Sequence, residues 1–142
     1  MKKLILSILI TLPIIMIMAF KTGETDKKSI TVRQPGENEL VDCLVKYKSN
    51  WGETCTQCGT AASPDTYIVY VKNTCSKKLD VMVGVQEESK WWRLSTFYGV
   101  NSSDTLRIYA CKGTGKWLKW AREANDKSFT FPTQKEVNEQ YK

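Results

Sequence analysis

The sequence contains no histidine. Histidine is the usual general base near neutral pH and a common zinc ligand, so its absence excludes Ser-His-Asp and Cys-His catalysis. Haem attachment through a C-x-x-C-H motif is also excluded, because Gly59 follows Cys58. The adjacent carboxylates Glu87 and Glu88 fall in an expected turn and form no recognisable glycosidase pair. The sequence therefore predicts a protein that is not an enzyme and that holds neither a metal nor a cofactor.

The chain also lacks a strong excess of basic over acidic residues. The chain has 21 Lys and Arg against 15 Asp and Glu, and a formal charge of +6. Without Lys2 and Lys3, which belong to the N-terminal segment described below, 19 basic residues remain and the charge is +4. This mild bias is too small for a nucleic-acid-binding composition but favours anionic surfaces. We expect an anionic envelope polymer or glycan as partner, and no nucleic acid.

Residues 1–20 have the layout of a secretory signal peptide. Lys2 and Lys3 form a positive start, and the run Leu4–Phe20 carries no charge. Because Ala19 makes a poor cleavage position, with a bulky residue two places before it, an uncleaved N-terminal anchor is the alternative. Either form places the protein outside the cytoplasm, periplasmic or secreted. Contact with a membrane is expected only through this segment, if it is not removed.

The rest of the chain divides into a tether and one domain. Residues 21–39 are polar, with glycine and proline and almost no apolar periodicity, which is typical of a linker. Residues 40–142 are long enough for a single domain with its own core.

Short stretches rich in β-branched and aromatic residues predict strands in this domain. The alternation of apolar residues is clearest in 79–86, and segment 40–48 fits either a half-buried strand or a short helix. The other expected strands are 66–71, 91–98, 106–111 and 116–122, with Lys112–Gly115 as a hairpin loop between the last two. Turns every 8–12 residues predict an all-β fold, a small antiparallel β-sandwich or barrel.

The C-terminal end carries a helix signal. Thr133 followed by Glu136 has the spacing of a capping box, and Val137 and Tyr141 share one helical face beyond it. A short terminal helix is therefore expected on the β-domain.

Five cysteines in an exported chain are expected to be mostly oxidised, which allows two disulfides and one unpaired thiol. We favour a Cys75–Cys111 disulfide, because both residues end expected strands beside turns. Cys43 is then expected to pair within the Cys55/Cys58 loop. The C-x-x-C motif itself has three interpretations: a structural staple, a thiol–disulfide site, or part of a four-thiolate zinc site with Cys43 and one more cysteine.

Tryptophan and basic residues concentrate near the expected last hairpin. Strand parity sends Trp117 and Trp120 to opposite faces, so only one of them can belong to a binding surface. We choose Trp120 for the surface and Trp117 for the core, since Trp120 is expected opposite Arg107 across the hairpin. The complete candidate binding set is Trp120, Lys116, Lys119, Arg122, Arg107 and Lys112. The alternative is that this face is only a solvated surface.

Several short motifs occur in a fixed order: N-x-C at 73–75, V-x-V-G at 81–84, then tryptophans and an aromatic strand that ends in Ala121-Arg122. This order resembles small secreted bacterial β-domains of uncharacterised function and covers Val69–Glu123. The resemblance implies an exported, non-catalytic domain and supplies no active-site residue.

These observations together predict an exported, non-enzymatic binding or structural module that uses a face rich in Trp and Lys. The alternative is a thiol–disulfide active exported protein that uses Cys55 and Cys58. A third interpretation, a purely structural envelope component, leaves both surfaces inert.

Overall fold

The computed structural model describes residues 39–59 and 63–142. The expected signal segment, 1–20, and nearly all of the expected tether, 21–39, lie outside the described residues. Within the described ranges, no helix is long and apolar enough to span a membrane.

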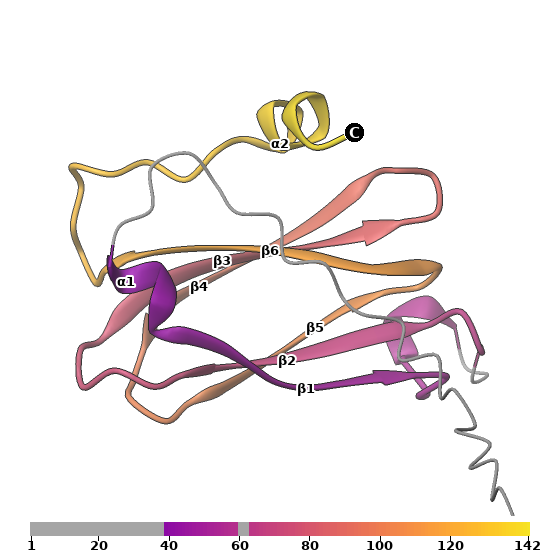
Figure 1. Cartoon of the computed structure of the whole chain (residues 1–142), viewed down its shortest axis with the longest axis horizontal. Coiled ribbons are helices and arrows are strands. Elements are labelled where there is room, and N and C mark those ends of the chain that lie inside the picture. Colours follow the sequence, from indigo (N-terminus) through magenta and orange to yellow (C-terminus); the bar gives the residue numbers. More distant parts are fainter. Residues whose placement is uncertain (1–38, 60–62) are drawn as a thin grey trace, which may run out of the picture.

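Two three-stranded antiparallel sheets form the described domain, with strand orders β1-β2-β5 and β4-β3-β6. Figure 1 shows the two sheets as stacked layers, with α2 on the outer side of sheet β4-β3-β6. The predicted all-β sandwich with a short C-terminal helix is confirmed. The elements are α1 (Glu39–Asp42), β1 (Leu44–Trp51), η1 (Thr56–Cys58), β2 (Tyr67–Asn73), β3 (Leu79–Glu87), β4 (Trp92–Val100), β5 (Thr105–Ala110), β6 (Gly113–Glu123) and α2 (Gln134–Gln140).

The main core lies between the two sheets. Alternate residues of β3 point into it and meet alternate residues of β2 and β5, as the period of two predicts. Trp117 of β6 is 2% exposed in this core, which confirms its assignment to the core. The fully buried apolar residues of this core include Leu44, Val69, Val71, Leu79, Val81, Val83 and Val85.

A second core lies on the outer face of sheet β4-β3-β6. Met82, Leu118 and Trp120 point out of the sandwich there, and Val137 of α2 packs against them. As a result, every residue of β3 except the last is buried, although its alternation predicts a half-buried strand. The C-terminal segment buries the face that a two-layer sandwich would leave in water.

The secondary structure predicted at the two ends of the domain is largely confirmed. Segment 40–48, which fits a strand or a helix, contains both, because α1 ends at Asp42 and β1 begins at Leu44. The capping box of α2 is present: the Glu136 backbone N–H donates to the Thr133 hydroxyl, and the Thr133 backbone N–H donates to the Glu136 carboxylate.

The expected hairpin over Lys112–Gly115 is wrong. Strand β5 pairs with β2 whereas β6 pairs with β3, so the chain passes from one sheet to the other at this point. Strand β6 already begins at Gly113, where an added Cβ would lie 2.3 Å from the Cβ of Tyr67. Glycine here permits a close approach of the two sheets rather than a tight turn.

The Cys75–Cys111 disulfide that we favour from the sequence is also wrong. The structure joins Cys43 to Cys75 and Cys58 to Cys111, with Cα–Cα distances of 5.2 and 5.3 Å. Because β5 runs antiparallel to β2, Ala110 pairs with Tyr67, at the end of β2 remote from Cys75. The two disulfides therefore lie at opposite ends of sheet β1-β2-β5, and Cys55 is the free cysteine of the described residues.

Candidate functional site

A β-bulge at one end of sheet β4-β3-β6 brings polar groups together. Leu79 pairs with Val100 and Val81 pairs with Phe97, which leaves two residues of β4, Tyr98 and Gly99, opposite Asp80 of β3. Gly99 has a φ of 64°, in the left-handed region that favours glycine. The bulge turns the Gly99 backbone N–H toward the Asp80 side chain, and this N–H donates to Oδ1 at 3.0 Å.

On its other side, Asp80 is paired with Arg122 of β6, its register partner. Arg122 donates from Nε and Nη2 to the Asp80 Oδ2, each at 3.1 Å. Its third nitrogen, Nη1, donates to the Phe129 carbonyl at 2.7 Å, and the guanidinium lies 5.0 Å from the ring centroid of Phe131. Asp80 is 4% exposed and Arg122 is half-buried, and each charge is balanced by the other.

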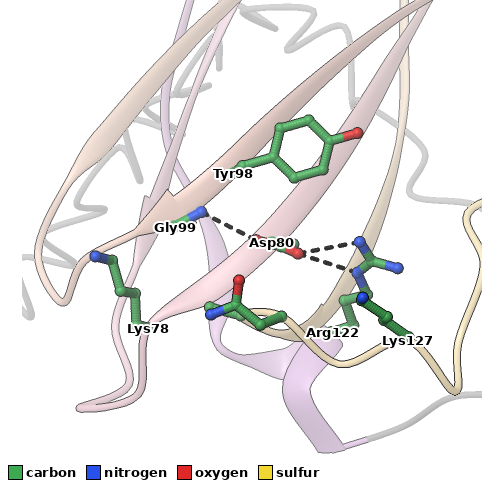
Figure 2. Close-up of a pocket in the computed structure, with 8 residues that line it drawn as sticks. Lys78, Asp80, Tyr98, Gly99, Arg122 and Lys127 are labelled. Atoms are coloured by element: carbon green, nitrogen blue, oxygen red, sulfur yellow. Dashed lines mark hydrogen bonds and ion pairs between the residues drawn. The ribbon is translucent and has the colours of Figure 1, made fainter.

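An open pocket of about 410 Å³ lies over this pair. In Figure 2, Lys78 and Lys127 stand on opposite sides of Asp80. Both lysines are exposed, and within residues 39–59 and 63–142 neither ammonium group has an ion-pair partner. The lining residues are Lys78, Asp80, Tyr98, Gly99, Arg122, Ala124, Asn125 and Lys127.

This arrangement suits an anionic group. Because Asp80 balances Arg122, the charges of Lys78 and Lys127 remain to attract a carboxylate or phosphate. The ring of Tyr98, 72% exposed, provides an aromatic surface on the same pocket. The pocket therefore combines two uncompensated cations with an aromatic side chain, in a space of the size that small ligands occupy.

The sequence-based binding face does not exist as one surface. Trp120, expected to be exposed, is 6% exposed, because Tyr141 covers it with ring centroids 6.4 Å apart. Arg107 lies in the other sheet and pairs with Tyr70 of β2, not with Trp120. The error follows directly from the expected β5–β6 hairpin, which would have placed Arg107 opposite Trp120.

The remaining basic residues of the candidate set are dispersed along β6. Lys119 points to the opposite face from Trp120, and its Nζ donates to the Leu44 carbonyl at 2.7 Å. Lys112 and Lys116 are exposed where β6 begins, and Arg122 lies near its other end. Of the six candidates, only Arg122 lines the pocket.

Sequence reasoning missed Lys78, Tyr98 and Lys127. They come from three separate segments, and no spacing between them is regular enough to act as a motif. The one local signal is Gly99 within an expected strand-to-turn region, since glycine there favours a bulge.

The cysteines rule out one interpretation of the C-x-x-C motif. Cys43 and Cys58 are both in disulfides, so the four-thiolate zinc site is wrong. No group of three or more Cys, Asp or Glu side chains is placed to hold a metal ion in the part of the chain that the structure describes.

Comparison with known proteins gives no further guidance: no family model, no curated protein and no solved structure matches the chain.

Proposed function

We propose that the protein is an exported, non-enzymatic binding module of the cell envelope or exterior. Its ligand is an anionic group, carboxylate or phosphate, on an envelope polymer or glycan. The binding site is the pocket between Lys78 and Lys127 rather than the face around Trp120.

The observation that carries this proposal is the charge arrangement in the pocket. The ion pair of buried Asp80 and half-buried Arg122 forms the floor with its own charges balanced, and two exposed lysines flank it. The fixed floor costs little to organise when a ligand binds, since the side chains that form it are already hydrogen-bonded. Export is supported by the signal-like residues 1–20 and by the two disulfides, which persist in oxidising compartments.

The test is retention of the secreted protein on two resins, one carrying polyglutamate and one carrying polyphosphate. The double variant Lys78→Gln/Lys127→Gln should lower the apparent affinity at least about tenfold on the resin that mimics the ligand, because both uncompensated charges are lost. Added salt should weaken wild-type retention as well. The two resins separate carboxylate from phosphate recognition.

The matched control is Lys112→Gln/Lys116→Gln, which removes two exposed charges at the other end of β6. It should change retention less than about twofold, since those lysines do not line the pocket. Equal losses in both double variants would mean that only the net charge matters. Unchanged retention in the Lys78/Lys127 variant would remove the pocket as the binding site.

A further inference from the structure

The free thiol of Cys55 lies one turn away from a disulfide. Cys55 is 2% exposed and precedes η1, and its carbonyl accepts a hydrogen bond from the Cys58 backbone N–H at 2.8 Å. A turn closed by such a bond brings the first and fourth Cα atoms within about 7 Å, the range in which a disulfide can form. The Cys58 sulfur is already bonded to Cys111. Three cysteines therefore share one small region.

The Cys55 side chain has polar neighbours: its thiol donates to Gln57 Oε1 at 3.2 Å, and Arg107 of β5 lies within hydrogen-bonding reach of it. Arg107 of β5 also donates to the Thr54 carbonyl at 3.5 Å, so it is held beside the loop that carries the thiol. Burial lowers the pKa of Arg107, but hydrogen bonds with Tyr70 and Cys55 outweigh this effect and raise it above its ordinary value. The guanidinium is thus held beside the loop that carries Cys55, and a cation near a cysteine favours the thiolate, which is the nucleophilic form.

We propose that Cys55 is the nucleophile of an internal thiol–disulfide exchange. Its thiolate attacks Sγ of Cys58, a Cys55–Cys58 bond forms, and the Cys58–Cys111 bond breaks. Cys111 leaves as the thiolate and takes up the proton that Cys55 released. One disulfide and one thiol become another disulfide and another thiol, so the step needs neither an oxidant nor a reductant.

The exchange changes how the loop is attached. The Cys58–Cys111 disulfide fastens η1 to the residue that follows β5. In the product, Cys55–Cys58 closes only a single turn, so this fastening is lost and Cys111, which is half-buried, becomes the free thiol. The Cys43–Cys75 disulfide is at the other end of β2 and takes no part.

The first test is to find which thiol a slow alkylating reagent traps in the native wild-type protein. Because Cys55 is buried, the reagent should label Cys111 at least about tenfold more than Cys55. In Cys55→Ser, labelling of Cys111 should disappear, since no internal nucleophile remains. Labelling of Cys55 alone, or no labelling of Cys111 after a day, would overturn the proposal.

The second test uses Cys111→Ser and peptide mapping under non-reducing conditions after acid quenching. When this variant is folded in an oxidising glutathione buffer, Cys55 and Cys58 should be joined by the oxidant, and the protein should contain no free thiol. The matched variant Cys75→Ser removes the other disulfide, so Cys43 should become free, and Cys111 should still be labelled in preference to Cys55 as in the wild type. If Cys111→Ser folds but both Cys55 and Cys58 react with the alkylating reagent, the two sulfurs cannot reach each other and the exchange is excluded.

Discussion

The outer faces of the two sheets are covered by different means. On sheet β4-β3-β6 the cover is the C-terminal segment, whose Val137 and Tyr141 pack on Trp92 and Trp120. The Trp92 indole N–H also donates to the Tyr141 carbonyl at 2.7 Å. This cover carries no disulfide.

On sheet β1-β2-β5 the cover is the loop before and around η1. Two of its hydrogen bonds reach the sheet: Glu53 accepts one from the Tyr70 hydroxyl at 3.0 Å, and the Thr54 carbonyl accepts one from Arg107 at 3.5 Å. The Cys58–Cys111 disulfide fastens it. The two covers gain stability in different ways: large apolar side chains stabilise a cover by burial, whereas a short loop is stabilised by a disulfide that restricts the unfolded chain.

The largest loss of stability is expected when the apolar cover of sheet β4-β3-β6 is disrupted. Trp120→Ala should lower the free energy of unfolding by about 3–5 kcal/mol, as Trp117→Ala should in the main core, because each removes a large buried side chain. Urea unfolding measures both. Trp91→Ala is the control and should change stability by less than about 0.5 kcal/mol, since Trp91 is 55% exposed. A silent Trp120→Ala would mean that the C-terminal segment does not cover the sheet.

The second largest loss of stability is expected when the disulfide that fastens the loop around η1 is removed. Cys58→Ser/Cys111→Ser should cost about 2–4 kcal/mol, because the disulfide restricts the unfolded chain. Differential scanning calorimetry of the double variant against wild type measures it. Cys55→Ser keeps both disulfides and should retain most of the wild-type stability. If the double variant melts like the wild type, the loop is held by its polar contacts and the contrast between the two covers is lost.

A smaller loss of stability is expected from a change at the N-terminus of α2, which belongs to the apolar cover. Thr133→Ala removes the hydroxyl that caps α2 and should cost about 1 kcal/mol. Chemical unfolding followed by tryptophan fluorescence is suitable, because Trp92 and Trp120 lie under the C-terminal segment. Thr133→Ser keeps the hydroxyl and should remain close to wild type. A loss equal to that of Thr133→Ala in the serine variant would exclude capping as the cause.

The smallest effect depends on pH. Hydrogen bonds from the Thr133 backbone N–H and hydroxyl lower the pKa of Glu136 below its ordinary value of 4.5. Because the pKa is lower in the folded state, this stabilisation is complete above 4.5 and is lost as the pH falls through the folded-state pKa. Unfolding curves of wild type and Glu136→Ala should therefore converge in acid. A difference in stability that does not vary with pH would show that the Glu136 charge has no part in it.

Local patterns determined much of the fold. The alternation in 79–86 and the β-branched stretch at 66–71 predict β3 and β2, because side-chain direction along a strand depends only on parity. The spacing of Thr133 and Glu136 predicts α2, since a capping box is formed within one turn of chain. Parity also separates Trp117 from Trp120 correctly.

Only the tertiary structure decided which surfaces and which strands lie next to these predicted elements. Parity cannot tell whether the second face of a sheet meets water or a helix, so the sequence assigns Trp120 to a surface that α2 covers. The disulfides and the pocket depend on which strands are neighbours, and β5 and β6 are consecutive in the chain but belong to different sheets. Lys78, Tyr98 and Lys127 meet over Asp80 only after that pairing is made, because contacts between distant segments follow the hydrogen bonds of the sheets rather than spacing along the sequence.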